Sequence, residues 1–500
     1  MIDLRDYLEA LKERGELLTI DKEVDWNLDA AAIAAMSNRT GAQAIHFTKV
    51  AGYPKGYTLA ANLFAGPGHL YYLYKRWMWS RIAIGLELDP KIDYELLIAT
   101  INDRRAHTIM PVKVTVAPCK EEIQVGDEVN VLKFPFPILH KEDGGRYGTG
   151  VFIVKDPDSD WQNWGVYRFM ILGRNRLVAD FLTEPSLSTD TRAIFEKYCA
   201  RNRPMPFAIA LGGAPAIMIA AAMRLPPGAG EVDAAGGLNL DPINLVKAET
   251  SDILVPGDAE IIIEGEVIPD ELVEEGPYGT IKGYTRPQPR PVMKVTAITH
   301  RKEPILPFIV DGTNGNDTQA LISITESARI TRICNEEYGD PIRWIQIPVD
   351  WNLGICIAAI MNPIPGMVFM VARHILAASN LFDKLIVVDW DVHPRSLNMV
   401  TMDWMQKVHP IRGHHVLEHY PPAVMPNYGE KEPGEGTARM YIDACWPAWY
   451  KPEEKPMPIT WESAFPEDLR ARVLKRWKEE FKIPIEPLVF ERHPFFGQQR

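Results

Sequence analysis

Residues 163–172, NWGVYRFMIL, begin with one polar side chain and continue mainly with aromatic, β-branched and aliphatic ones. Segments of this composition, bounded by Gly, Pro and Asp, are typical of β-strands. Asn163 and Arg168 are an odd number of positions apart, so a strand directs them to opposite faces unless a bulge intervenes. An amide oxygen suits a hard cation and a guanidinium suits a carboxylate, so we expect the two side chains to serve adjacent subsites.

Strand-forming segments lie on both sides of this run. They occupy residues 150–155, 208–221, 259–267 and 292–299. Together they predict a barrel-like β domain over residues 111–304. The longest uncharged run, residues 207–223, contains Gly212, Gly213 and Pro215 and falls short of the length that spans a membrane. We therefore expect a buried strand, loop and strand there.

The N-terminal region alternates helices and strands. Residues 3–14 carry apolar side chains at helical spacing, with Asp3 as the expected N-cap and Gly15 as the stop. The next elements are an extended segment at residues 44–50 and helices at residues 69–84 and 93–105. This alternation predicts an α/β domain over residues 1–110.

The alternation returns after the β-rich region. Helices are expected at residues 322–335 and 367–379, and an apolar strand at residues 385–388. These elements predict a C-terminal α/β domain over residues 305–500. Residues 467–482 form an amphipathic pattern, and a terminal helix of this kind often docks on a neighbouring subunit.

Composition restricts the class of protein. A chain of 500 residues with 46% hydrophobic and 24% charged side chains is typical of a soluble globular protein. The formal net charge of −12 argues against nucleic acid as a partner. The start lacks a secretory signal, and the five cysteines form no C-x-x-C pair, so we expect reduced thiols and a cytoplasmic, non-membrane protein.

Three polar clusters could carry chemistry. They are residues 163–168, residues 220–231 and the acidic turn at residues 274–280. Arg168 alone is more often a surface or strand-pairing arginine, and Glu274-Glu275 alone is more often a solvated turn. The order and spacing of the three clusters together carry the signal.

This order resembles the UbiD family of decarboxylases. The family carries an N-W-x-x-x-R strand, a later metal-binding glutamate, and an E-G-P-[FY]-G turn followed by G-Y. Matching positions here are Asn163, Trp164, Arg168, Glu231, residues 275–279 and residues 283–284. The resemblance continues at KLIVVD, residues 384–389, and MYIDA, residues 440–444, and so covers nearly the whole chain. It implies an α/β fold with an N-terminal α/β domain, a central split β-barrel that binds prenylated FMN, and a C-terminal α/β domain that also mediates oligomerisation.

The resemblance also implies two cation sites beside the cofactor phosphate. Asn163 and Glu231 would bind Mn²⁺ or Mg²⁺, and Lys384 would meet the phosphate directly. A K⁺ ion would use Glu231 and the main-chain carbonyls of three further residues, Trp164, Ala221 and Met223. Hard oxygen ligands suit both ions. Without the resemblance, the favoured interpretation of Lys384 is a solvated lysine at the start of a strand.

Arg168 and Glu275 would flank the flavin edge in this family. The arginine would hold the substrate carboxylate or pair with the glutamate. An adjacent guanidinium keeps a glutamate ionised, which suits a base or an electrostatic partner more than an acid. The cofactor itself would add to the unsaturated carbon of the substrate and allow carbon dioxide to leave.

Two positions depart from the family pattern. Aligning residues 194–197 with the family's I-F-x-K helix puts Asp190 where a histidine completes the metal site. A carboxylate is a competent ligand for Mn²⁺ or Mg²⁺, although Asp190 could equally be only the N-cap of the helix. The family's acid after E-G-P-[FY]-G is Thr280 here, and a hydroxyl cannot supply a proton as a carboxylic acid does. Thr280 could hold a water, or the proton could come from Lys282 or Tyr278.

Two functions follow as hypotheses. The first is reversible, non-oxidative decarboxylation of an aromatic, heteroaromatic or other α,β-unsaturated acid, free or as a coenzyme A thioester, by a homodimer or homohexamer that receives its cofactor from a flavin prenyltransferase. The second, motivated by Asp190 and Thr280, is a cofactor-binding but catalytically silent subunit of a larger carboxylase complex. Residues 399–405, rich in Met and aromatic side chains, could line a pocket or simply pack in a core.

Overall fold

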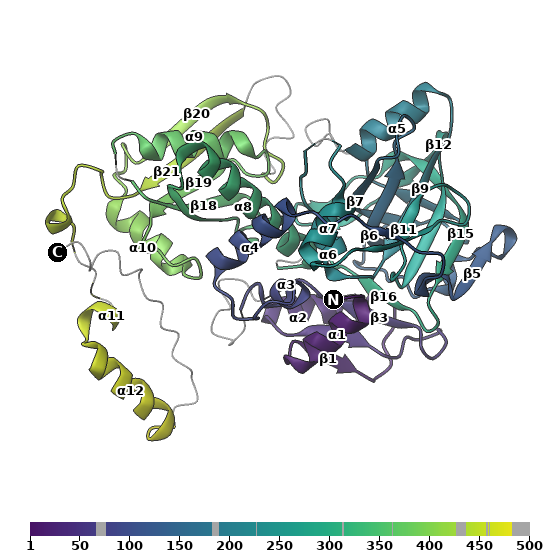
Figure 1. Cartoon of the computed structure of the whole chain (residues 1–500), viewed down its shortest axis with the longest axis horizontal. Helices are drawn as coiled ribbons and strands as arrows, with labels where there is room; N and C mark the ends of the chain where they lie inside the picture. Colours follow the sequence, from purple (N-terminus) through teal and green to yellow (C-terminus); the bar gives the residue numbers. More distant parts are fainter. Residues whose placement is uncertain are drawn as a thin grey trace. The chain divides into compact units, whose positions relative to one another are not determined.

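The computed structural model in Figure 1 describes residues 1–66, 77–182, 190–226, 228–312, 315–362, 364–426, 437–456, 459 and 461–482. It divides into two compact units. The first holds the described residues up to Glu326, and the second holds those from Ser327 onward.

The first unit begins with a small α/β layer. Its four-stranded sheet has the order β1-β2-β3-β16, with strands Leu17–Ile20, Ala44–Phe47, Thr58–Ala61 and Ile305–Phe308. The accompanying helices are α1 Leu4–Glu13, α2 Asp29–Thr40, α3 Ser80–Gly85 and α4 Tyr94–Ala106. The predicted helix at residues 3–14 is confirmed, and the Asp3 carboxylate caps it by accepting the Asp6 amide N–H at 2.9 Å.

The other N-terminal predictions are largely confirmed. The extended segment at residues 44–50 contains β2, and the helix expected at residues 93–105 is α4. Only the end of the helix expected at residues 69–84 can be compared, because residues 67–76 lie outside the described ranges; α3 covers that end. β16 follows residue 304 in sequence but pairs in parallel with β3, so the N-terminal sheet includes a strand from beyond the β domain. The domain boundaries at residues 110 and 304 stay predictions.

A closed six-stranded β-barrel forms the centre of the first unit. Its strands follow the order β12-β9-β6-β7-β8-β15, and β15 pairs with β12 to close the barrel. Their bounds are β6 Arg146–Lys155, β7 Gln162–Ile171, β8 Arg176–Ala179, β9 Met205–Leu211, β12 Ile261–Glu275 and β15 Gln288–His300. The β6–β7 register runs without a shift, so Asn163 and Arg168 lie on opposite faces of β7, as predicted.

One predicted strand is confirmed in its first part and wrong in its second. The expected strand at residues 208–221 ends as β9 at Leu211, and Pro215–Ala221 is helix α6. Gly212 and Gly213, both with positive φ, turn the chain between β9 and α6. Pro215 stands in the first helical turn, where its missing N–H costs nothing, and the alanines that follow favour a helix.

Helices and short elements surround the barrel. α5 Asp190–Ala200, α6 and α7 Glu231–Asn239 each contact β7, and α5 and α6 also contact β6. Short strands are β4 Val112–Lys113, β5 Glu122–Val125, β10 Asn244–Lys247, β11 Leu254–Pro256, β13 Gly279–Thr280 and β14 Gly283–Tyr284. Short 3₁₀ turns are Pro118–Lys120, Gly126–Glu128 and Val131–Lys133.

The second unit is a separate α/β layer. Its five-stranded sheet has the order β17-β18-β19-β21-β20, with strands Ile342–Gln346, Ile355–Ile360, Lys384–Asp389, Thr437–Ala444 and His414–Tyr420. The central strands β18, β19 and β21 are parallel, and the run at residues 385–388 is buried, as its composition predicts. Other elements are α9 Met367–Ala378, α10 Leu397–Lys407, α11 Trp461–Ala464, α12 Glu467–Glu479 and the 3₁₀ turns Val349–Trp351 and Pro452–Glu454.

Two predicted helices of the C-terminal half can be compared with the structure. Helix α8, Asp317–Tyr338, confirms the helix predicted at residues 322–335. Helix α12 lies within the predicted amphipathic segment at residues 467–482 and has no buried residue. Among the described helices, none combines the length and apolar character that crossing a membrane requires. The predicted fold class is confirmed: an α/β chain whose middle part is a closed barrel.

Candidate active site

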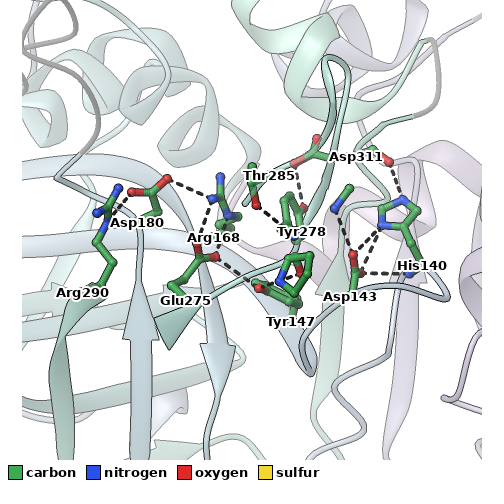
Figure 2. Close-up of polar contacts among 12 residues, drawn as sticks. His140, Asp143, Tyr147, Arg168, Asp180, Glu275, Tyr278, Thr285, Arg290 and Asp311 are labelled. Carbon is green, nitrogen blue, oxygen red and sulfur yellow. Dashed lines mark hydrogen bonds and ion pairs between the residues drawn. The ribbon is translucent and has the colours of Figure 1, made fainter. Parts of the chain in front are cut away.

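An arginine–glutamate pair, with a half-buried arginine and a buried glutamate, lies on the barrel wall (Figure 2). Arg168 comes from β7 and Glu275 from the end of β12. The guanidinium meets the carboxylate through two bonds, Nε to Oε1 at 3.0 Å and Nη2 to Oε2 at 3.1 Å. Burial alone would lower the pKa of Arg168, but Glu275 and Asp180 raise it above its ordinary value. The arginine is therefore a permanent cation in this site.

A second acid and a second arginine extend the pair. Arg168 Nη2 also donates to Asp180 Oδ2 at 2.9 Å, and Arg290 Nε donates to Asp180 Oδ1 at 2.8 Å. The four side chains form one charge network, seen on the left of Figure 2. Bidentate and shared bonds of this kind fix the plane of a guanidinium, so Arg168 can present a defined edge to a carboxylate ligand.

Two tyrosines complete the surroundings of the pair. Tyr147 OH donates to Glu275 Oε1 at 3.2 Å, so this carboxylate accepts bonds from two different side chains. The Tyr147 and Tyr278 rings lie 4.5 Å apart, and the Arg168 guanidinium carbon lies 4.6 Å from the Tyr278 ring centroid. Burial raises the pKa of both phenols, so each is a hydrogen-bond donor at neutral pH.

Further polar contacts lead from Tyr278 to the neighbouring loops. Tyr278 OH donates to Asp311 Oδ2 at 2.9 Å, and the Gly279 amide donates to Asp143 Oδ1 at 2.9 Å. His140 lies 3.1 Å from Asp143 Oδ2 through Nδ1 and 2.8 Å from the Asp311 carbonyl oxygen through Nε2. Burial opposes the charged imidazole, but Asp143 and Asp311 together raise the pKa of His140.

Thr280 takes part in a turn. Its hydroxyl donates to the Gly283 carbonyl at 2.8 Å and accepts from the Lys282 amide at 3.1 Å. These bonds stabilise the hairpin of β13 and β14. The structure therefore gives the Thr280 hydroxyl a local structural task, and no carboxyl group stands at this position.

The predicted metal ligands gather on the other face of β7, beside α5 and α7. The Trp164 amide donates to Glu231 Oε2 at 3.0 Å, and Asn163 Nδ2 donates to Thr191 Oγ1 at 2.8 Å. Asp190 is the first residue of α5, and Glu231 is the first of α7. Because the Asn163 amide nitrogen is held by Thr191, its oxygen is left to serve as a ligand.

The charges around Glu231 fit a cation. Burial raises the pKa of Glu231 to about 7, the negative charges of Asp190 and Asp233 add to the rise, and the Trp164 amide opposes it. Burial also raises the pKa of Asp190. A divalent ion would offset this crowding of carboxylates, and a set of carboxylate and amide oxygens is what Mn²⁺ and Mg²⁺ prefer.

The remaining predicted ligands are placed as follows. Ala221 is the last residue of α6 and Met223 follows it closely, where main-chain carbonyls lack partners inside the helix. Lys384 belongs to the second unit, where its Nζ lies 2.7 Å from Asp383 Oδ1. The K⁺ and phosphate roles of these residues stay predictions.

Several residues around the candidate site were not predicted from the sequence. They are single polar residues with no motif of their own: Asp180, Arg290, Tyr147, Thr191 and Asp311. Thr191 directly follows the predicted ligand Asp190, and the others have no predicted site residue beside them in the sequence. Folding of the barrel brings these residues close to Arg168 or Asn163 although they are far apart in the sequence.

Known proteins that resemble the chain in sequence or fold include decarboxylases of the UbiD class. The chain is 29% identical over 501 residues to the pyrrole-2-carboxylic acid decarboxylase of Pseudomonas aeruginosa, covering 96% of this chain and 98% of the relative. It superposes on the vanillic acid decarboxylase of Sedimentibacter hydroxybenzoicus in its open form with a TM-score of 0.82 and 25% identity, covering 96% and 99% of the two chains. The UbiD-class enzyme HmfF of Pelotomaculum thermopropionicum, in complex with FMN, has the same fold, with a TM-score of 0.81, 24% identity and coverage of 93% and 99%.

Three family models match successive parts of the chain. They describe the N-terminal domain of 3-octaprenyl-4-hydroxybenzoate carboxy-lyase at residues 8–101, its Rift-related domain at residues 111–314, and its C-terminal domain at residues 319–444. These matches follow one another along the chain and together cover most of the sequence. The chain therefore belongs to the UbiD family and is a carboxy-lyase.

Proposed function

We propose that this chain catalyses the reversible, non-oxidative decarboxylation of an aromatic, heteroaromatic or other α,β-unsaturated carboxylic acid, using prenylated FMN. The observation that carries the proposal is the bidentate Arg168–Glu275 pair, held in place by Asp180 and Tyr147. A relative acts on pyrrole-2-carboxylic acid and a structural neighbour on vanillic acid, and both are aromatic acids. One structure of HmfF contains prenylated FMN.

Arg168 has the properties of a carboxylate-binding residue. It is a cation whose plane is fixed by two acids, so it can attract a substrate carboxylate without rearranging. Glu275 balances part of its charge through a direct ion pair. When bound, prenylated FMN would supply the electrophile that makes the carboxylate carbon–carbon bond labile.

Three oxygen donors would hold the divalent ion. Asn163 and Glu231 are buried, and Asp190 opens the adjacent helix α5. In this assignment Asp190 replaces a nitrogen ligand by an oxygen ligand and so favours Mn²⁺ or Mg²⁺ over softer metals. K⁺ would use Glu231 with the carbonyl groups of Trp164, Ala221 and Met223, and Lys384 would bind the cofactor phosphate.

The proposal also covers the form of the substrate, the source of the cofactor and the oligomeric state. The substrate would be a free acid or its coenzyme A thioester, and carbon dioxide would be the other product or, in reverse, a substrate. A flavin prenyltransferase would supply the cofactor, and the working form would be a homodimer or homohexamer. The structural support for a second function, a silent subunit of a larger carboxylase, is the turn-bound hydroxyl of Thr280.

Turnover by the isolated chain tests the proposal. The chain would be co-expressed with a flavin prenyltransferase, purified without oxygen, and its released flavin identified by mass spectrometry. Carbon dioxide release would then be measured with pyrrole-2-carboxylate, vanillate and 3,4-dihydroxybenzoate. We expect a prenylated flavin and turnover of at least one aromatic acid. Loaded protein that neither decarboxylates any acid nor exchanges labelled carbon dioxide would favour the silent subunit.

A further inference from the structure

The site as described lacks an acid at the position where its family usually has one. Once carbon dioxide leaves, the carbon that carried it needs a proton. Thr280 cannot hold that proton as an acid, and its hydroxyl already makes two bonds inside the β13–β14 hairpin. A proton donor must therefore come from another part of the chain or from solvent.

The segment after β16 reaches the same hairpin. A Cβ atom built on Gly312 would lie 3.3 Å from the Thr280 carbonyl oxygen and 3.5 Å from the Gly279 carbonyl carbon. Gly312 has a φ of +79°, a conformation that glycine adopts without strain. Gly312 is thus a direct spatial neighbour of Gly279 and Thr280, and Asp311 precedes it in the chain.

Asp311 brings a carboxyl group to this place. Its side chain is half-buried, and Tyr278 OH donates to its Oδ2 at 2.9 Å. The Tyr278 ring lies 4.6 Å from the Arg168 guanidinium carbon, so one tyrosine side chain separates Asp311 from the predicted carboxylate-binding arginine. His140 Nε2, 2.8 Å from the Asp311 carbonyl oxygen, fixes the backbone at this point. Figure 2 marks the Glu275–Arg168 and Tyr278–Asp311 hydrogen bonds, and the Arg168–Tyr278 contact between them is a cation–π contact.

We propose that Asp311 holds the proton that the reacting carbon receives, in place of the acid that is absent at position 280. The proposal rests on the proposed decarboxylase function. In the step, the bond to the departing carboxylate breaks, its electron pair stays on the substrate carbon, and a proton from the Asp311 carboxyl forms the new C–H bond. Asp311 is left ionised and takes its next proton from water; in the carboxylation direction it accepts the proton instead.

The surroundings of Asp311 favour its protonated form. Burial raises its pKa, while the hydrogen bond from Tyr278, the nearby Thr318 side chain and the charges of Arg168 and His140 oppose the rise. These groups come from the turn after β12, from α8, from β7 and from the loop before β6. A carboxyl whose pKa moves towards neutrality is suited to general acid catalysis. Because the acid form donates, the rate should fall as pH rises through the pKa of Asp311.

Asp311→Asn tests the proposal, since asparagine has the same shape and can still accept the Tyr278 hydroxyl. The matched control is Asp258→Asn, because Asp258 is also half-buried and burial also raises its pKa. We expect D311N to retain the flavin and to lose turnover by about 10²- to 10⁴-fold, the usual range for a general acid. The alkaline fall in the pH–rate profile should vanish in D311N, and D258N should behave as the wild type.

A second variant separates acid chemistry from structure. Thr280→Glu in the D311N background returns a carboxyl to the family's usual position, and we expect turnover to rise about tenfold or more above D311N. Wild-type turnover and pH profile in D311N would overturn the proposal. So would loss of flavin from D311N, because Asp311 would then be a structural residue.

An infrared titration needs neither cofactor nor substrate. In the flavin-free chain, several carboxyls titrate above the usual range of aspartate, and the wild-type signal should contain one component that D311N lacks. Asp258 is another carboxyl with a raised pKa, so D258N should lose a different component and keep the one assigned to Asp311. A D311N signal equal to that of the wild type contradicts the proposal. A loaded wild-type chain without any turnover would refute the decarboxylase function, whereas the infrared result bears on Asp311 alone.

Discussion

Thr191→Val should weaken divalent cation binding although Thr191 is not itself a predicted ligand. Thr191 is fully buried in α5, and its Oγ1 accepts from Asn163 Nδ2 at 2.8 Å and from Tyr167 OH at 3.2 Å. Valine keeps the volume and removes the hydroxyl. The Asn163 amide would then lose the bond that directs its oxygen away from Thr191.

The magnitude follows from the cost of the lost bond. A buried donor without a partner costs about 1–3 kcal/mol. If the cation alone must hold the Asn163 amide in the ligand orientation, most of this cost falls on cation binding. At about 1.4 kcal/mol for each factor of ten, the affinity falls about 5- to 150-fold. Loss of a residue that orients a metal ligand usually costs about 10- to 100-fold, which lies in the same range.

The assay measures how much Mn²⁺ the chain needs to bind FMN. Flavin fluorescence is recorded at fixed FMN and protein while Mn²⁺ is added, and the midpoint concentration should rise about 10- to 100-fold in Thr191→Val. Thr191→Ser keeps the hydroxyl and should restore the wild-type midpoint. Thr299→Val is the matched control, because Thr299 is equally buried and its Oγ1 has no hydrogen-bond partner among the described residues.

Two results would refute this reasoning. An unchanged midpoint in Thr191→Val would mean that Thr191 does not orient Asn163 in the cation-bound state. An equal rise in Thr191→Val and Thr299→Val would mean that the loss of any buried hydroxyl in the barrel or in its surrounding helices disturbs flavin binding. A normal midpoint in Thr191→Ser combined with a raised one in Thr191→Val isolates the hydroxyl as the cause.

Four further predictions follow from the same site. Glu231→Ala should lose flavin, measured by the absorbance of the purified chain, because it removes a buried cation ligand. Arg168→Ala should retain flavin but lose turnover by about 10²- to 10³-fold; equal flavin loss in both variants would show that Arg168 is misplaced in our assignment. Dialysis against EDTA should release flavin, and Mn²⁺ or Mg²⁺ should restore binding better than Zn²⁺, since the donors are oxygens; retention of flavin in EDTA would argue against the divalent site. Thr280→Val should slow product formation less than about tenfold, because the hydroxyl lies in a turn and the acid is assigned elsewhere; a larger loss with flavin retained would return the proton transfer to Thr280.

Most of the fold was predictable from local patterns. Apolar spacing and the cap Asp3 predict α1, and the uninterrupted apolar run at residues 385–388 predicts the buried strand β19. The wrong strand at residues 208–221 shows the limit of such patterns. A fully apolar run has no period, so a buried helix and a buried strand look alike in sequence. There the deciding signal was Pro215 after two glycines, which starts α6.

The candidate site was predictable only where a motif exists. Arg168 and Glu275 belong to two motifs, and the structure pairs them directly. Asp180 and Arg290 belong to none, and they meet because β8 and β15 are neighbours in the barrel, with Val178 opposite Val292. Such a contact depends on strand order, which the sequence of each strand alone does not contain.

The two departures from the family pattern are different in kind. At Asp190, the first residue of α5, an imidazole is replaced by a carboxylate, which is also able to bind a cation. In our assignment the position therefore keeps its function with a shifted metal preference. At Thr280 the functional group itself is missing, because a hydroxyl does not act as an acid at neutral pH. The Asp311 carboxyl comes from a different segment, which reaches the hairpin because Gly312 lets two backbones lie in contact. In our proposal, an acid lost from one motif is supplied from outside it. In a chain of this fold, the proton donor should be sought around the β13–β14 hairpin in space, and a chain with no carboxyl at either position 280 or position 311 should bind the flavin without efficient proton transfer.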